Sequence, residues 1–322
     1  MTISKPFVFA SITMILLPLI SFAQSPVSYS VKKFGAKGDG KSDDTKAIQE
    51  AIDKAALTKN ANVVFPSGIY LISNISIKAN IKGAGNAIIK KIKMPLDLFV
   101  FCNIRDIKSI KVSNITFDGS VVLDADRKVI SGSTPLHVYN CQDIIITNCT
   151  FKNSPFGGLR LEASKNIAVS SSKSIGSRGV FGDGFYITGT NTVQVTNCIA
   201  DDYERIGFVT EGNSFNISFT DCLAKNGRNA SILSGGIEYN AGFWYENSAN
   251  IKTVRCTAIN NTHRGFVATT GEKIGDFILE NIASFEFENC KSINNPTGFA
   301  VASFGKAVNT TLRNCSVSNS TT

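Results

Sequence analysis

Two acidic residues and one arginine stand in front of neighbouring glycine–phenylalanine pairs in the middle of this chain. Asp183 directly precedes one pair, and Glu204 and Arg205 come shortly before the next. Inverting hydrolysis of a glycosidic bond needs a carboxylic acid and a carboxylate base at a separation of roughly 6.5–9.5 Å. We expect Asp183 and Glu204 to form this catalytic pair, with Arg205 binding the carboxylate of an acidic sugar through two hydrogen bonds.

A glycine–apolar phrase recurs through the second half of the chain and predicts a repeating fold. The six copies are Gly158-Leu159, Gly184-Phe185, Gly207-Phe208, Gly242-Phe243, Gly265-Phe266 and Gly298-Phe299. Cysteines alternate with these copies, with Ser172 expected in one missing place: Cys149, Cys198, Cys222, Cys256, Cys290 and Cys315. Such short strands bury an apolar core only when successive coils stack. The pattern therefore predicts an all-β fold, a right-handed parallel β-helix.

The cysteine spacing also predicts the redox state of the thiols. A regular ladder of buried cysteines in a large repeat core needs no covalent links, so we expect free thiols rather than disulfides. Cys102 and Cys141 lie outside this predicted ladder. Their state is left open.

Strand alternation predicts which side chains leave the core next to the repeated phrase. If the apolar residue after each glycine points inward, the next residue and the one two beyond it point outward. We expect this outer face to form a groove for an extended polymer, with charged side chains and sugar-stacking rings. The expected substrate-binding residues are Arg160, Glu162, Tyr186, Glu211, Trp244 and Glu246, with His263 and Arg264 before a glycine and Glu238 in an insertion.

The N-terminal part predicts two segments ahead of the repeats. Residues 1–23 combine Lys5, a short apolar run and a small-residue cleavage pattern, which is typical of a secretory signal peptide and predicts a secreted or periplasmic protein. Residues 24–322 are expected to form a single β-helix domain. Its cap strand and helix fall at about 28–57, where the amphipathic segment Lys46–Ala55 would cover the open end of the solenoid.

The composition restricts the partners. With 18% charged and 43% hydrophobic residues the chain is globular, and its net charge of +8 is compatible with a polyanionic partner. No basic cluster is interleaved with aromatic residues, so we expect no nucleic acid, and after signal cleavage no membrane contact. The two histidines, His137 and His263, show no zinc-ligand spacing, so we expect no metal cofactor. Calcium remains open for a lyase, and the oligomeric state is unknown.

The opening of the repeat region resembles a known superfamily. Residues 34–45, which read Phe-Gly-Ala-Lys-Gly-Asp-Gly-Lys-Ser-Asp-Asp-Thr, and residues 63–70 are similar to the start of the pectate-lyase-like β-helix proteins. That group includes polygalacturonases, rhamnogalacturonases and C5-epimerases. The resemblance implies the same fold and an acidic polysaccharide as substrate. Asp183 matches the aspartate of the polygalacturonase pattern, whereas the position of the family's aspartate pair falls on Glu204-Arg205.

Three functions follow from these patterns, and hydrolysis of an acidic polysaccharide in the manner of a polygalacturonase is favoured. The first alternative is a polysaccharide lyase or C5-epimerase, in which Tyr186 removes a proton and an arginine stabilises the resulting charge. The second alternative is a non-catalytic glycan-binding or adhesion solenoid. Broken family motifs at the candidate site favour this last possibility.

Overall fold

The computed structural model describes residues 26–92, 101–228, 239–270, 283–303 and 308–321. The predicted signal segment, residues 1–23, lies outside these ranges. Within them the chain is almost entirely β-structure, with one α-helix near its start. No helix in the described part is long and apolar enough to cross a membrane.

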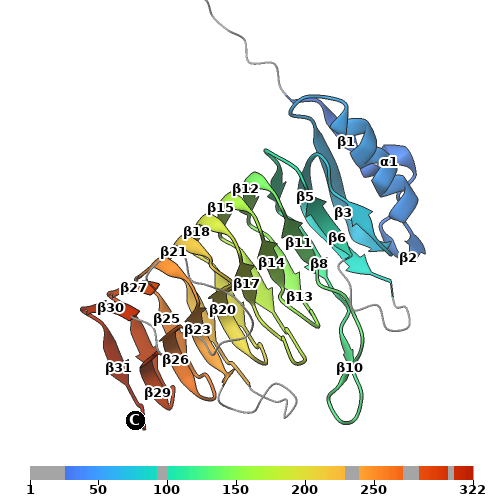
Figure 1. Ribbon diagram of the computed structural model, residues 1–322. Coiled ribbons are helices and arrows are strands. Elements are labelled where there is room, and N and C mark those ends of the chain that lie inside the picture. Colours follow the sequence, from blue (N-terminus) through green and yellow to red (C-terminus); the bar gives the residue numbers. More distant parts are fainter. Residues whose placement is uncertain (1–25, 93–100, 229–238, 271–282, 304–307, 322) are drawn as a thin grey trace, which may run out of the picture.

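Short parallel strands stack into a right-handed parallel β-helix, as the repeats predict (Figure 1). Each full coil contributes one strand to a nine-stranded sheet, called sheet B here, and two consecutive strands to a 20-stranded sheet, called sheet A. Sheet B contains, in spatial order, β4 (Ile75–Ser76), β6 (Cys102–Arg105), β11 (Leu136–Tyr139), β14 (Leu159–Glu162), β17 (Phe185–Thr188), β20 (Ile206–Glu211), β23 (Ala241–Glu246), β26 (Arg264–Thr269) and β29 (Thr297–Ala302).

Sheet A holds two columns of strands that follow sheet B within each coil. The first column is β7 (Lys111–Ser113), β12 (Gln142–Thr147), β15 (Lys165–Ser170), β18 (Asn191–Thr196), β21 (Phe215–Thr220), β24 (Ala249–Val254), β27 (Ala283–Glu288) and β30 (Val308–Arg313). The second is β8 (Thr116–Asp118), β13 (Thr150–Lys152), β16 (Lys173–Ile175), β19 (Ile199–Asp201), β22 (Leu223–Lys225), β25 (Thr257–Ile259), β28 (Lys291–Ile293) and β31 (Ser316–Ser318). The N-terminal strands β1 (Ser28–Ser30), β2 (Asp39–Asp43), β3 (Asn62–Ile72) and β5 (Asn80–Lys91) complete the sheet.

A helix covers the first coil, as its apolar stripe predicts. Helix α1 (Thr45–Ala56) follows a short 3-10 helix, η1 (Val31–Phe34). The carboxylate of Asp44, just ahead of α1, accepts hydrogen bonds from the backbone N–H groups of Lys37 (2.6 Å) and Gly38 (2.9 Å). Asp44 therefore fixes the turn before the helix. The side chains that α1 buries completely are Ile48, Ala51, Ile52 and Ala55.

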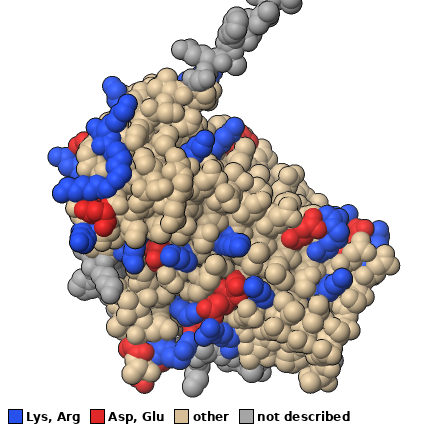
Figure 2. Space-filling model, turned by 180° about the vertical axis from the view of Figure 1, so that it is seen from behind, with Lys and Arg blue, Asp and Glu red and all other residues tan. Residues whose placement is uncertain are grey.

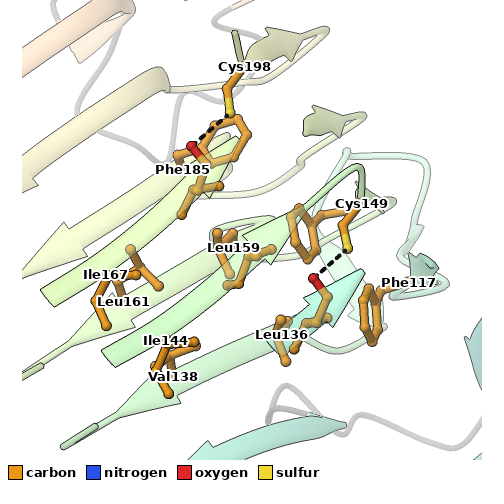
Figure 3. Close-up of a cluster of buried hydrophobic side chains, with 14 of the residues drawn as sticks. Phe117, Leu136, Val138, Ile144, Cys149, Leu159, Leu161, Ile167, Phe185 and Cys198 are labelled. Carbon is orange, nitrogen blue, oxygen red and sulfur yellow. Dashed lines mark hydrogen bonds between the residues drawn. The ribbon is translucent and has the colours of Figure 1, made fainter. Parts of the chain in front are cut away.

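The apolar residue after each repeated glycine points into the core. Phe185 and Phe208 stack with their ring centroids 4.8 Å apart and their planes 3° from parallel, and the same stack continues to Phe299. Figure 3 shows the start of this column, where Leu136, Leu159 and Phe185 lie above one another. The glycine itself is needed for the close approach of coils. A Cβ atom on Gly207 would lie 2.6 Å from the carbonyl oxygen of Gly242.

The cysteine ladder is present, and all eight cysteines are free. Ser172 fills the missing rung, because its hydroxyl accepts a hydrogen bond from the backbone N–H of Cys149 at 3.1 Å. The thiol of Cys149 in turn reaches the carbonyl oxygen of Val112 on the preceding coil, a contact drawn in Figure 3. Burial raises the pKa of Cys149 to about 11. The thiol of Cys149 is therefore an inert packing group.

Cys141 belongs to a second ladder that the sequence does not reveal. Its backbone N–H donates to the hydroxyl of Ser164 (2.9 Å), and the N–H of Ser164 donates to the hydroxyl of Thr190 (3.3 Å). Ser214 continues the series at the same corner. Cys141 lies outside the ladder of Cys149, as predicted, and the second ladder escapes notice in the sequence because serine and threonine fill the equivalent position in the following coils. Cys102 is buried and free.

One antiparallel hairpin leaves the solenoid. Strands β9 (Val122–Leu123) and β10 (Val129–Ser131) pair with each other rather than with sheet A or sheet B. In Figure 1 this hairpin projects from the body near β13. It lies between two regular coils, and its residue Arg127 forms an ion pair with Glu204 near the candidate site.

Charged side chains are distributed in small mixed groups over the surface. Figure 2 shows Lys and Arg gathered over the N-terminal end, whereas basic and acidic side chains alternate elsewhere on the same face. Lys252 on β24 belongs to one such mixed group. Its Nζ atom lies 3.8 Å from a carboxylate oxygen of Glu286 and 3.6 Å from one of Glu288. Much of the excess positive charge on this face is therefore local to one end.

Candidate functional site on the outer face of sheet B

Two outward rows of side chains run across sheet B. Strand alternation directs the residue after the inward aromatic position, and the residue two beyond it, away from the core. The register aligns the first row as His137, Arg160, Tyr186, Val209, Trp244 and Val267. The second row is Tyr139, Glu162, Thr188, Glu211, Glu246 and Thr269. We call these two rows the sheet-B face.

Tyr186 and Glu211 form the central polar contact of this face. The hydroxyl of Tyr186 on β17 donates to Oε1 of Glu211 on β20. Burial raises the pKa of the Glu211 carboxyl, and the charges of Asp183 and Glu246 act in the same direction. The hydrogen bond from Tyr186 and the guanidinium of Arg205 oppose this shift without cancelling it. A carboxyl group in this position can hold a proton and donate it.

Glu162 lies in the same row, two coils before Glu211. Its Oε2 atom lies 3.1 Å from Nε of Arg160 and 3.1 Å from Nε2 of His137. Burial, followed by the charge of Arg160, lowers the pKa of His137 and favours the neutral imidazole. Burial and the neighbouring charge of Glu211 raise the pKa of Tyr186. The phenol of Tyr186 is therefore a hydrogen-bond donor rather than a base.

Asp183 is not on the sheet-B face but beneath it. The carboxylate has no exposed surface, and it accepts hydrogen bonds from Nε (2.8 Å) and Nη2 (2.5 Å) of Arg205 and from the backbone N–H of Ile206 (3.1 Å). The guanidinium of Arg205 lies over the exposed ring of Phe181, 4.9 Å from its centroid. Asp183 thus orients Arg205, which differs from the expectation that it faces substrate as an acid.

Glu204 is also buried, and it fastens the β9–β10 hairpin to the solenoid. Its carboxylate accepts hydrogen bonds from Nη2 of Arg127 (2.5 Å) and from the backbone N–H of Gly179 (2.5 Å), and only 1% of the residue is exposed. Both carboxylate oxygens are therefore occupied. The expected Asp183–Glu204 pair does not meet at an open surface, because each carboxylate is committed to its own arginine.

The remaining predicted residues are placed as follows. Nε1 of Trp244 donates to Glu246 at 3.0 Å, and Arg264 lies over the indole ring at 5.7 Å. Trp244 is only 9% exposed and packs in a small outward apolar cluster, so it is not an open stacking surface. His263 is half-buried, and Glu238 lies outside the described residues. The structure adds Arg127 and Phe181, neither of which belongs to the repeated glycine–apolar phrase.

No group of three or more potential metal ligands from His, Cys, Asp and Glu is found in the described ranges. The acidic residues of the sheet-B face contact arginine, tyrosine or tryptophan instead. What the face offers chemically is a carboxyl proton at Glu211, a second carboxyl group, Glu162, beside Arg160, and guanidinium groups for an anionic ligand.

Comparison with known proteins identifies the family to which the chain is similar. The family model described as "Rhamnogalacturonase A/epimerase, pectate lyase-like" matches residues 28–232. Alginate lyase 7 of Azotobacter vinelandii is 45% identical over 76 residues, 20% of this chain and 9% of that protein. Plasmin and fibronectin-binding protein A of Streptococcus pneumoniae is 31% identical over 171 residues, 46% of this chain and 24% of that protein. A polygalacturonase of Prunus persica is 27% identical over 222 residues, 61% of this chain and 55% of that protein.

Among solved structures, the family 28 exopolygalacturonase of Yersinia enterocolitica superposes with a TM-score of 0.63 at 15% identity, covering 92% of this chain and 67% of that one. This likeness shows the fold. The matches span a quarter or less of the length of the first curated relatives. The family match covers well over half of the chain, from the cap strand through the coils that carry Asp183 and Glu211. The chain therefore belongs to the rhamnogalacturonase A/epimerase family of pectate-lyase-like β-helix proteins.

Proposed function

We propose that this protein hydrolyses glycosidic bonds in a uronate-containing polysaccharide, with Glu211 as the proton donor. The observation that carries the proposal is the environment of Glu211, which raises the pKa of a carboxyl group on an outward row. General acids of glycosidases are carboxyl groups whose pKa is raised in this way. The family and the matched polygalacturonase support an acidic polysaccharide as the substrate class.

Glu162 is the proposed base. It occupies the same row as Glu211 with Thr188 between them. A strand spacing of about 4.8 Å places the two backbone positions about 9.6 Å apart. In inverting glycosidases the two carboxyl groups lie roughly 6.5–9.5 Å apart and leave room for a water molecule. Glutamate side chains at these backbone positions can reach that separation by rotation about their side-chain bonds. Arg160, beside Glu162, and Arg205, beside Glu211, supply guanidinium groups for a uronate carboxylate.

The lyase and epimerase alternative receives less support from the same contacts. A tyrosine base must lose its proton easily, but the pKa of Tyr186 is raised and its hydroxyl donates to Glu211. The sequence pattern favours Asp183 and Glu204 as the catalytic pair, but both residues are buried, which argues against that role. We assign them structural roles instead. Export through the segment at residues 1–23 remains part of the proposal.

The test is turnover of pectic and alginate polysaccharides, followed in parallel by new reducing ends and by the absorbance of unsaturated uronate. Reducing ends without that absorbance are expected for the wild type, and Glu211→Gln should lose at least about a hundredfold in kcat. Glu288→Gln, a half-buried carboxylate on sheet A, is the matched control and should keep full activity. Unsaturated products from the wild type would contradict hydrolysis.

A non-catalytic glycan-binding role is the second candidate. It is favoured by one observation, namely that neither residue matching the polygalacturonase pattern is exposed. The segment shared with the plasmin and fibronectin-binding protein is compatible with such a role. Saccharide binding in the same panel, with neither assay signal and with an unchanged uronate composition of the recovered polysaccharide, would decide for this candidate rather than for a C5-epimerase.

A further inference from the structure

Four arginines around the sheet-B face each lie over an aromatic ring of an adjoining coil. The distances from the guanidinium carbon to the ring centroid are 4.2 Å for Arg105 over Tyr139, 4.7 Å for Arg160 over Tyr186, 4.9 Å for Arg205 over Phe181 and 5.7 Å for Arg264 over Trp244. We call these four residues the stacked arginines. Tyr139, Tyr186 and Trp244 are themselves members of the two outward rows.

Ion pairing does not distinguish the stacked arginines from the other five, since Arg160 and Arg205 pair with Glu162 and Asp183. The ion pairs of the other five are Arg127 with Glu204, Arg178 and Arg228 with Asp202, Arg255 with Asp221 and Arg313 with Glu286. Within the part of the chain that the structure describes, none of these five lies over an aromatic ring. Aromatic support of arginine is therefore a property of the sheet-B side of the molecule and not of the chain in general.

Stacking prepares a guanidinium to bind an anion. The ring covers one flat face and restricts the rotamers of the side chain, while the N–H groups at the edge stay directed sideways. Arg160 commits Nε to Glu162, and Arg205 commits Nε and Nη2 to Asp183, so each keeps further N–H donors. Arg105 is exposed. These groups can each donate to a carboxylate without first losing side-chain entropy.

The stacked arginines recur on alternate coils. Arg105 ends β6, Arg160 lies in β14, Arg205 directly precedes β20 and Arg264 begins β26, while Tyr139, Tyr186 and Trp244 lie on the coils between. A strand spacing of about 4.8 Å makes each step about 9.6 Å along the solenoid axis and the whole series about 29 Å. The separations between the arginines themselves are larger, because they also lie at different positions along their strands.

The series also crosses the sheet obliquely. Arg105 lies at the end of its strand, Arg160 near the middle of its strand, and Arg205 and Arg264 at the starts of theirs. A ligand that contacts all four must therefore be long, extended and inclined to the solenoid axis. Isolated monosaccharides or compact anions can contact only one of them.

We infer that the stacked arginines form one binding track for an extended polyuronate, each binding a carboxylate of the chain. This inference rests on the proposed function for the substrate class, and it adds the minimum length of the chain that the protein binds fully. The outermost members, Arg105 and Arg264, lie several coils apart on either side of Glu211. These two arginines would then set the length of ligand that is fully bound. They take no part in proton transfer.

The test is binding of size-defined oligogalacturonates and oligomannuronates, measured by calorimetry on the Glu211→Gln variant so that turnover does not shorten them. Affinity should rise with oligomer length until the chain spans at least about 29 Å and then level off. Arg105→Gln and Arg264→Gln should each lower the affinity of the longest oligomers about five- to tenfold and leave short oligomers unaffected. Arg255→Gln, an exposed arginine paired on sheet A, is the matched control.

Three results would contradict the binding track. They are an equal loss of affinity at every oligomer length, no loss of affinity in either variant, and an equal loss in Arg255→Gln. Thermal unfolding of each variant checks that it is folded. The two proposals fail separately. Length-dependent binding without turnover by the wild type would retain the track and reject the hydrolase, whereas turnover with length-independent binding would do the reverse.

Discussion

Burial decides which acidic residues near sheet B can exchange a proton with a ligand. Asp183 and Glu204 have essentially no exposed surface, whereas Glu211 and Glu162 are half-buried on an outward row. A buried carboxylate with two charge-assisted hydrogen bonds holds its partner arginine in place and is closed to a ligand. The half-buried carboxyl of Glu211 combines partial desolvation with access, which is what a general acid needs.

The first prediction concerns Glu211 and pH. A general acid works while it is protonated, so the raised pKa of Glu211 should place the alkaline limb of kcat/KM above the range of an ordinary glutamate. Tyr186→Phe removes a hydrogen bond that lowers this pKa, so the limb should move to still higher pH. Profiles of kcat/KM against pH for the two proteins measure the shift. Movement of the limb to lower pH in Tyr186→Phe would contradict the assignment.

The second prediction concerns the ion pair of Asp183 and Arg205. Asp183→Asn leaves a largely buried guanidinium without its countercharge, which should lower the free energy of unfolding by about 3–5 kcal/mol. Asp221→Asn removes a similar two-bond contact with Arg255 at the exposed surface. It should cost no more than about 1 kcal/mol. Urea denaturation of both variants gives the comparison, and equal losses would contradict the structural role of Asp183.

At the scale of single strands, the two faces of each sheet B strand have different requirements. The inward positions of β20 contribute Phe208 to the aromatic stack and Thr210 to the row behind it, while the glycine before Phe208 keeps neighbouring coils close. A polar atom on the inward side must find a partner within the core. The hydroxyl of Thr210 is completely buried and, in the described part, has no hydrogen-bond partner.

The third prediction follows from this hydroxyl. Thr210→Val keeps the shape of the side chain and removes the unpaired polar atom, so it should raise the free energy of unfolding by about 1 kcal/mol. Thr253, equally buried, contacts the hydroxyl of Tyr245 at 2.7 Å, and Thr253→Val should therefore lower stability by about 1–3 kcal/mol. Thermal or chemical denaturation measures both. Destabilisation by Thr210→Val would show that its hydroxyl has a partner in solution.

At the scale of the whole molecule, stability comes from stacking identical positions along one axis. The aromatic column, the cysteine ladder and the second ladder that starts at Cys141 each run through several coils. Each coil buries its apolar side only against its neighbours, so the solenoid behaves as a continuous core closed at one end by α1. Cross-links are unnecessary in such a core.

The fourth prediction tests that conclusion. All eight cysteines are free, and only Cys315 is not fully buried. A thiol reagent should therefore modify Cys315 in the native protein and all eight thiols after denaturation without reductant, because the reagent cannot reach buried thiols. Cys315→Ser should abolish the native reaction. Fewer than eight thiols after denaturation would reveal a disulfide.

Much of the architecture could be predicted because its causes are local. Strand alternation assigned Arg160, Glu162, Tyr186 and Glu211 to outward rows, and the register of sheet B places them there. The helix stripe identified α1, and the spacing of Cys149 and Cys198 placed Ser172 in the ladder. Each of these features depends on neighbours in sequence or on one repeat length.

The identity of the exposed carboxyl groups depends on contacts that no local pattern contains. Glu204 meets Arg127, which lies 77 residues earlier in a hairpin outside the repeat, and Asp183 lies under an arginine that stacks on Phe181. Sequence periodicity determined the solenoid, its cap and the direction of the outward rows. Only the tertiary structure decided that Glu211 rather than Asp183 or Glu204 is accessible, because burial depends on how side chains from distant segments pack over one another.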